Sequence, residues 1–227
     1  MRRIALPLIL GLTGCLTTGV LQTAETAGKD NLQFAFEPGV VGIADGNGNA
    51  GVLPSFNVAA RYGVSERTDI GGRFGTSLIE LHVKTMFTEP NPDELQVAFA
   101  PHLGGFFASG GGGGAGLFWL KLPVLFDIPV GEHDLILGPG ARVIGVLGGG
   151  GGGGSAGGGI LLLGSSIGFG ARIGERARLI PEFGIEYPIV GAAAAGGDGI
   201  TGGLGGGAVF SFQLGVVLGG RSKGKEM

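Results

Sequence analysis

The sequence predicts an all-β chain that folds into an antiparallel, up-and-down transmembrane β-barrel of about ten strands, within a range of about eight to twelve. Three observations support this fold class. Apolar and polar side chains alternate with a period of two from Asn31 onward, which is the periodicity of strands. The charged side chains of these segments fall on one face. The connections between the segments are of two kinds, which alternate along the chain.

Length and composition narrow the possibilities before any motif is considered. The chain has 227 residues, with 44% hydrophobic and 15% charged residues, which suits one sizeable folded domain and not a disordered chain. Its 53 glycines follow no strict three-residue period, which excludes collagen. A net charge of -3 without a basic stripe argues against a nucleic-acid partner. One cysteine excludes a disulfide within the chain.

The first residues are expected to be a targeting segment. Arg2 and Arg3 precede an apolar stretch, 4–12, that is too short to act as a stop-transfer helix. The sequence Leu-Thr-Gly-Cys at 12–15 resembles the lipobox of bacterial lipoproteins, which implies cleavage before Cys15 and acylation of that cysteine. We therefore expect a lipoprotein-type signal peptide at 1–14 and a small, polar tether at 15–30. The alternative is an ordinary signal peptide with an incidental cysteine.

Residues 31–220 are expected to form the barrel. In the segment 117–130, for example, Phe118, Leu120 and Leu122 share one face, and Trp119 and Lys121 share the other. Most segments exceed the nine to eleven or so residues that a tilted membrane strand requires. The expected strands are 31–44, 52–65, 69–75, 79–88, 94–108, 117–130, 135–147, 160–174, 179–190 and 206–219.

The connections between the expected strands differ in character. One kind is short and charged, and includes 66–69, 89–94, 132–134 and 175–178. The other kind is nearly uncharged and rich in small residues, and includes 45–51, 75–78, 109–116, 148–159 and 191–205. Alternate connections of an up-and-down barrel lie on opposite rims, so each kind is expected to occupy one rim. An even number of strands then places both ends of the barrel on one rim.

The hairpin Tyr62–Phe74 resembles the short periplasmic hairpins of outer-membrane β-barrel proteins of Gram-negative bacteria, with an aromatic-Gly strand end, a polar turn and a Gly-rich strand. This resemblance implies an outer-membrane location. With the lipobox resemblance and an even number of strands, it implies that both termini are periplasmic, with a periplasmic tail at 221–227. The two resemblances together imply three partners, which are outer-membrane lipid, the barrel assembly machinery and the lipoprotein sorting machinery. Trp119 and Tyr187 are candidates for an aromatic belt. The family usually ends its last strand on an aromatic residue, whereas this chain continues through Gly219 into a basic tail.

The charged face of the expected strands is predicted to line the lumen, because a charge that faces lipid costs about 2–4 kcal/mol at the bilayer midplane. Six cationic and five carboxylate side chains can pair there, which indicates a narrow, largely plugged lumen and not a wide pore. The predicted lumen charge network consists of Glu37, Arg61, Arg73, Glu80, His82, Lys84, His102, Lys121, Asp127, Arg142, Arg172, Glu182 and Glu186.

No catalytic, metal or cofactor site is expected. His82 and His102 with Glu80 could form an acid–base pair or a metal site, but a third metal ligand at suitable spacing is missing, and a polar lumen network is the simpler interpretation. The function expected is structural, binding or narrow permeation. A surface-tethered β-sandwich lipoprotein that binds an apolar ligand or partner is the first alternative. A lipid-modifying barrel enzyme, with Ser166 or Ser211 as candidate nucleophile, is the second.

Overall fold

The structure is a computed structural model that describes residues 19–45, 49–75, 78–91, 93–110, 113–149, 155–174, 176–195, 198–202 and 207–220. The expected signal peptide at 1–14, the expected lipidation site Cys15 and the expected tail at 221–227 lie outside these residues. No helix in the described part of the chain is long and apolar enough to cross a bilayer.

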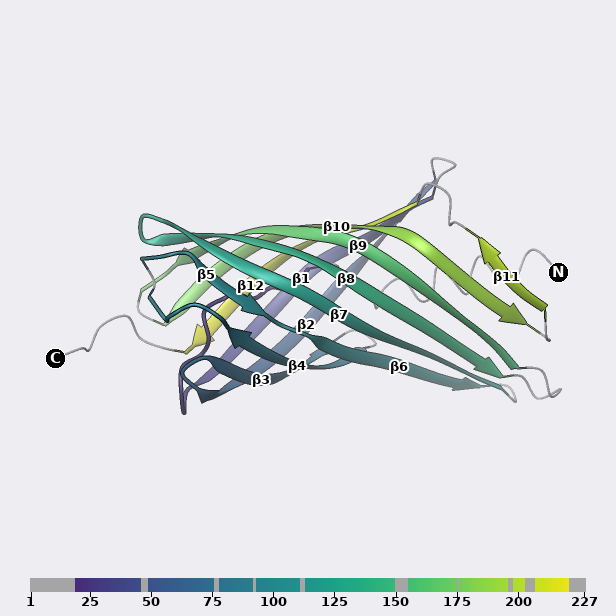
Figure 1. Cartoon of the computed structure of the whole chain (residues 1–227), viewed down its shortest axis with the longest axis horizontal. Coiled ribbons are helices and arrows are strands. Elements are labelled where there is room, and N and C mark those ends of the chain that lie inside the picture. Colours follow the sequence, from purple (N-terminus) through teal and green to yellow (C-terminus); the bar gives the residue numbers. More distant parts are fainter. Residues whose placement is uncertain are drawn as a thin grey trace.

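The described strands close into one antiparallel barrel (Figure 1). β5 and β6 lie one after the other along the same position of the ring, between β4 and β7. Among the described residues, β11 pairs with β10 alone and lies outside the ring. The twelve strands therefore occupy ten positions of the barrel. The barrel closes because β12 pairs with both β1 and β10. The strands are β1 (Leu32–Ala44), β2 (Ala50–Ser65), β3 (Thr68–Gly75), β4 (Leu78–Met86), β5 (Gln96–Phe99), β6 (His102–Gly110), β7 (Gly113–Val130), β8 (His133–Gly149), β9 (Ser155–Arg172), β10 (Ala177–Ala195), β11 (Asp198–Gly202) and β12 (Ala208–Gly219).

The two rims of the barrel are defined by the ends of these strands. We call one end the turn rim; it carries the short connection after Ser65 and both ends of the barrel chain. The amide of Gly220 donates to the carbonyl of Leu32 over 3.1 Å, which joins the end of β12 to the start of β1 there. We call the opposite end, where β1 stops at Ala44 and β2 starts at Ala50, the loop rim.

The predicted fold class, an all-β antiparallel barrel of ten strands, is confirmed. The expected strand 94–108 is a single barrel position that is interrupted at Ala100 and Pro101. The strands also extend further toward the loop rim than the sequence suggested. Glycine-rich stretches that were expected as loops, such as 113–116 and 155–159, are paired strand residues, because ladder hydrogen bonds to a neighbour outweigh the weak strand propensity of glycine.

Several prolines within strands coincide with breaks in the hydrogen-bonded ladders. The pairing of β1 with β12 skips Pro38, and that of β7 with β8 skips Pro139. The pairing of β9 with β10 skips Pro181 and shifts register between Pro188 and Val190. Each proline lacks an amide hydrogen, so a local gap or bulge is the expected consequence.

The distribution of polarity is the reverse of that of a water-soluble sandwich. Outward-facing side chains are apolar and exposed, as shown by Phe74 at 63%, Leu81 at 64% and Phe107 at 72% exposure. Charged side chains of the strands point inward and are buried, with Glu37 and Lys84 at 0% exposure. The closed ring and this polarity contradict the β-sandwich alternative, whose outer faces should be polar.

Candidate functional site

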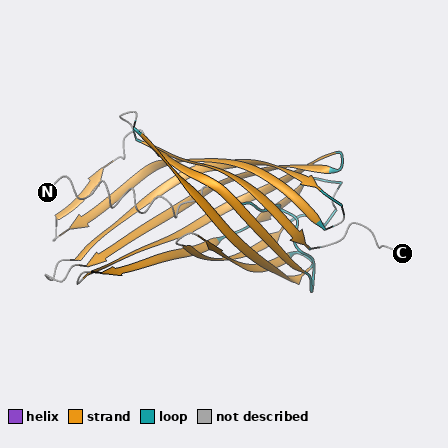
Figure 2. Cartoon of the chain, turned by 180° about the vertical axis from the view of Figure 1, so that it is seen from behind, coloured by secondary structure: helices purple, strands orange, loops and turns teal. Residues whose placement is uncertain are grey.

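The N-terminal part of the described chain lies inside the barrel. We call residues 19–30 the lumen segment; in Figure 2 it is the loop trace that runs between the strands near the turn rim. Leu21, Ala24 and Ala27 are fully buried, and Val20 is 3% exposed. The sequence suggested a tether at 15–30, so from Gly19 onward the structure differs from that expectation: the chain fills the lumen.

The lumen segment runs toward the turn rim, with Gly19 deepest in the barrel. Asp30 donates its amide to the carbonyl of Gly63 over 2.9 Å at the end of β2, next to the turn. A Cβ atom on Gly63 would lie 1.9 Å from the carbonyl oxygen of Gly28, so only glycine permits this close approach. Gly19, at the other end, donates its amide to Ser211 Oγ over 3.1 Å, well inside β12.

Side chains of the barrel wall accept the amide hydrogens of the lumen segment. Glu182 accepts from Val20 through Oε1 at 2.6 Å and from Leu21 through Oε2 at 2.9 Å. Asp69 accepts from the amide of Ala27 through both carboxylate oxygens, at 3.0 and 3.1 Å. Hydrogen bonds to carboxylates are stronger than those between neutral groups, so these contacts fix the segment in place.

Cationic side chains of the wall bind the carbonyl oxygens of the same segment. Arg73 Nη2 donates to Val20 O over 2.7 Å, and Arg61 Nη2 donates to Leu21 O over 3.0 Å. Lys84 Nζ donates to the carbonyl of Thr23 over 3.1 Å. A buried, unpaired backbone needs partners for its amides and carbonyls, and the lumen charges supply them. The lumen therefore binds the main chain of this segment through charged side chains of the wall.

A second function of these charges is to bind one another across the lumen. Arg73 bridges two carboxylates, with Nε 2.8 Å from Glu37 Oε2 and Nη1 3.2 Å from Glu80 Oε1. Glu80 also accepts from Trp119 Nε1 over 2.9 Å and lies 2.8 Å from His102 Nδ1. The strand between Glu80 and Trp119 carries Gly104, where a Cβ would lie 2.5 Å from the indole ring. The missing side chain at this position lets Trp119 reach Glu80.

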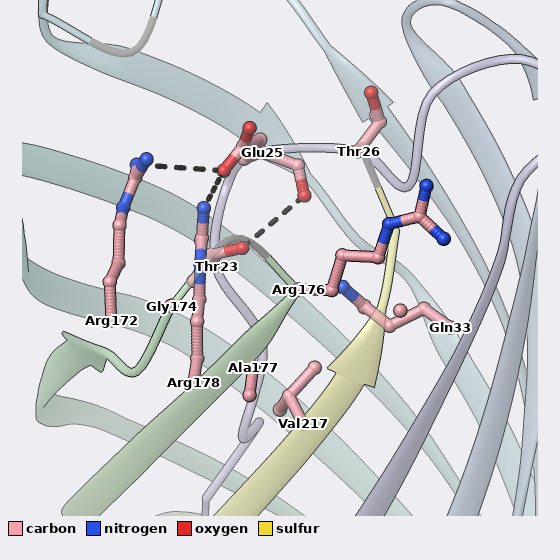
Figure 3. A pocket seen from close by; sticks show the side chains of 11 residues that line it. Thr23, Glu25, Thr26, Gln33, Arg172, Gly174, Arg176, Ala177, Arg178 and Val217 are labelled. Atoms are coloured by element: carbon pink, nitrogen blue, oxygen red, sulfur yellow. Dashed lines mark hydrogen bonds and ion pairs between the residues drawn. The ribbon is translucent and has the colours of Figure 1, made fainter. Parts of the chain in front are cut away.

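A third group of charges holds the lumen segment at the turn rim (Figure 3). The carboxylate of Glu25 forms ion pairs with Arg178 and, at 3.7 Å, with Arg172. Asp134 pairs with the same two arginines, at 3.7 and 3.3 Å. A cavity of about 60 Å³ adjoins this cluster and is also lined by Thr23. We call Glu25, Arg172, Arg178 and Asp134 the rim latch, because Glu25 belongs to the lumen segment and the other three belong to the wall.

The structure places the predicted lumen residues on the inner face. All of them are buried except Arg172, whose side chain is 13% exposed at the turn rim. Arg142 pairs with Glu186 over 2.9 Å, and Lys84 pairs with Asp69 over 3.2 Å. Most of the others meet in the clusters described above. The buried members are Glu37, Arg61, Arg73, Glu80, His82, Lys84, His102, Lys121, Asp127, Arg142, Glu182 and Glu186.

The histidines and serines take structural positions in this network. The rings of His82 and His102 lie 5.0 Å apart, and His102 Nε2 lies 3.3 Å from Gln22 Nε2 of the lumen segment. Within the described ranges, no group of three or more His, Cys, Asp or Glu side chains is arranged to hold a metal ion. Ser211 binds the amide of Gly19, and Ser166 is buried on the inner face of β9.

Several residues of the site were missed by sequence reasoning. Asp69, Asp134 and Arg178 were assigned to the short, charged connections. The alternation of their strands, continued toward the turn rim, places them on the inner face. Trp119 was a candidate for an aromatic belt, and this assignment is wrong: its side chain is 1% exposed inside the barrel. Tyr187, the other candidate, is 51% exposed on the outer face.

The role of Glu182 can be tested by amide hydrogen exchange. In the Glu182→Ala variant, the amides of Val20 and Leu21 are expected to exchange at least about tenfold faster, because each loses a hydrogen bond to a charged acceptor, worth about 1.5–3 kcal/mol. Glu186→Ala is the matched control on the same strand, since Glu186 pairs with Arg142 of the wall. Equal exchange in both variants would show that Glu182 does not hold the segment.

Comparisons with known proteins give only distant likenesses. No protein-family model matches the chain, and no curated protein matches it. Neisserial surface protein A is similar at 10% identity with a TM-score of 0.44, over 82% of this chain and 96% of that chain. The translocator domain of the autotransporter NalP from Neisseria meningitidis is similar at 14% identity with a TM-score of 0.46, over 84% of this chain and 88% of that chain. The outer membrane protease OmpT from Escherichia coli is similar at 7% identity with a TM-score of 0.48, over 88% of this chain and 99% of that chain. At these values none of the likenesses carries an argument about function.

Proposed function

We propose that this chain is an outer-membrane β-barrel of a Gram-negative bacterium whose lumen is closed by its own N-terminal segment, and that it acts as a membrane-embedded structural or binding protein. The observation that carries this proposal is the set of hydrogen bonds between the lumen segment and the wall, in which Glu182, Arg73 and Lys84 each bind its main chain. A lumen filled in this way is not an open pore.

Insertion in a membrane is supported by the outer face of the barrel. Large apolar side chains are exposed around the ring, on strands as far apart as β2, β6 and β10, represented by Phe56, Leu103 and Phe183. A continuous apolar belt of this extent would be unstable in water and is stable against lipid acyl chains. Closure of the sheet also removes free strand edges over most of the ring, as a membrane requires.

The orientation of the barrel follows from its connections. Bacterial outer-membrane barrels have short periplasmic turns and longer loops outside. The turn rim, which holds both Leu32 and Gly219, is therefore proposed to face the periplasm. Acylation of Cys15 and involvement of the barrel assembly and lipoprotein sorting machinery remain predictions of the sequence.

Catalysis is not part of the proposal. The polar groups that a barrel enzyme would use are engaged in holding the lumen segment. Ser211 binds Gly19, His102 lies between Glu80 and Gln22, and Glu182 binds two amides. A deletion strain is accordingly expected to show unchanged lipid profiles.

Two measurements on the purified full chain test the proposal. The unboiled protein should migrate differently from the boiled protein on a detergent gel, because a closed barrel resists unfolding by detergent. Reconstituted in a planar bilayer, it should show no steady ion conductance, because the lumen segment occupies the path. A protein that stays monodisperse in buffer without detergent would contradict membrane insertion. A stable open channel would contradict closure of the lumen.

A further inference from the structure

The barrel wall has a gap on the loop-rim side, above the hairpin that β3 and β4 form. The ladder between β2 and β3 ends at the pair Asn57 and Gly75, and that between β4 and β6 ends at Ile79 and Gly105. Beyond these pairs, within the described residues, positions 50–55 of β2 pair only with β1, and 106–110 of β6 pair only with β7. β2 and β6 thus each present an edge toward the other. Pro54 lies in this part of β2, and prolines in sheets are typical of edges.

A groove of about 640 Å³ lies at this gap. Its lining includes residues of both faces of the wall. Phe74, Phe107 and Phe118 point outward and are 63%, 72% and 46% exposed, whereas Phe106 and Leu117 belong to the inner face. The groove therefore lies at the edge of the wall, where inward-facing Phe106 and Leu117 adjoin outward-facing residues. None of its lining residues is charged.

The groove adjoins an apolar cluster on the inner face of the wall. Leu117 is a member of a buried apolar cluster that includes Trp119 and Val209, and Phe106 packs against that cluster. The cluster lies on the loop-rim side of the lumen segment. Val209 is one inward position beyond Ser211, the partner of Gly19, and Trp119 is one beyond Lys121, whose Nζ lies 3.4 Å from Gly19 O. The described lumen is therefore polar and filled by the lumen segment near the turn rim, and an apolar cluster lies next to it on the loop-rim side.

The depth of the gap places it where lipid is present. β3 and β4 have 8 and 9 residues, which is at or just below the nine to eleven or so that a tilted strand needs to cross a bilayer. With the turn rim in the periplasm, the end of this hairpin lies at the outer leaflet. Free strand edges are not stable against lipid, so a gap at this depth favours an opening that leads to a protein cavity.

We propose that this gap is a lateral portal, through which a long alkyl chain passes from the outer leaflet into the apolar upper lumen and binds there. The portal is formed by Phe74, Ile79, Phe106, Phe107, Leu117 and Phe118. The apolar lining without charged residues suits an aliphatic chain, and the lumen segment forms the floor of the site. The inference rests on the membrane insertion proposed above and adds the class of ligand.

The test uses the full chain in proteoliposomes that contain palmitate with a photoreactive diazirine at the end of its alkyl chain. After irradiation, labelled residues are located by mass spectrometry. Label is expected on the inward-facing Phe106 and Leu117 as well as on outward residues such as Phe118. In Leu117→Asn, the inward label should fall about tenfold, which corresponds to about 1.4 kcal/mol, because a polar amide interrupts the apolar path. Phe106→Ala, which widens the path and stays apolar, should increase the inward label.

Leu120→Asn is the matched control, because Leu120 lies on the same strand, faces outward and is not among the groove residues. Its inward label should equal that of the unchanged chain. Label that is confined to outward-facing residues in every variant would contradict the portal. The portal would also be contradicted if a second copy of the chain, cross-linked along β2 and β6, fully protected the groove from the label. The difference in gel migration between boiled and unboiled protein is recorded for the unchanged chain and for each variant. If the unchanged chain shows no such difference, membrane insertion itself is contradicted. If the difference is present but no inward-facing residue is labelled, only the portal is contradicted.

Discussion

A chain that lacks residues 19–27 is expected to conduct ions across a planar bilayer where the full chain is silent. The deletion removes the buried main chain to which Glu182, Arg73 and Lys84 are bound. Water can then enter the lumen and hydrate these charges, so the wall retains its ladders and the barrel stays folded. The expected change, from no steady conductance to a defined single-channel conductance, is the largest functional effect that the structure predicts.

The ion selectivity of the deleted chain provides an internal control. The charged wall residues that would line the opened lumen are balanced in sign, so selectivity between cations and anions should be weak. These residues are the cationic Arg61, Arg73, Lys84, Lys121, Arg142, Arg172 and Arg178, and the anionic Glu37, Asp69, Glu80, Asp127, Asp134, Glu182 and Glu186. A deleted chain that remains heat-modifiable but silent would mean that the wall side chains alone close the lumen.

Arg73→Ala is expected to cause the largest loss of stability among single substitutions in the lumen. Its guanidinium group binds Glu37, Glu80 and the carbonyl of Val20 at once. Removal leaves two buried carboxylates without this partner, and breaking a buried ion pair from one side costs about 3–5 kcal/mol. Urea unfolding in lipid vesicles, followed by tryptophan fluorescence, measures the difference directly, since Trp119 binds the same carboxylate of Glu80.

Arg67→Ala is the matched control for that measurement. Arg67 pairs with Glu89 outside the barrel, and exposed ion pairs contribute about 0–1 kcal/mol. The unfolding midpoint of this variant should stay close to that of the unchanged chain. Similar losses for both arginines would show that the interior of the barrel is hydrated enough to screen its ion pairs.

The barrel could be predicted from the sequence because alternation is a local property. Phe118 and Lys121 lie on opposite faces of their strand because they are an odd number of residues apart. The free-energy cost of placing a charge against lipid decides which of the two faces turns inward. Strand ends were less predictable where glycine dominates. Gly157 and Gly159 have no side chain whose polarity would show which residues face the lumen. The strand is defined there by the pairing of Gly157 with Leu147 and of Gly159 with Gly145.

The lumen segment could not be predicted from its own residues. Many of its hydrogen bonds to the wall are made by the main chain of Val20, Leu21 and Ala27, and such bonds leave no trace in the type of side chain. A small, polar stretch without periodicity is equally compatible with a tether. An indirect signal was the number of charges that turn inward, because Glu182 and Arg61 need hydrogen-bond partners wherever they are buried.

The most direct test of this account is the accessibility of position 24 to a membrane-impermeant maleimide in the folded, membrane-embedded chain. Ala24 is fully buried against Ala98, Ala100 and Leu125, whereas Lys29 near the turn rim is exposed. The label is read at each position by mass spectrometry, so Cys15 does not interfere. Ala24→Cys is expected to react at least about a hundredfold more slowly than Lys29→Cys, because reaction requires the segment to leave the lumen. Equal rates at the two positions would show a segment that lies in solvent as a tether, and would contradict the closed lumen.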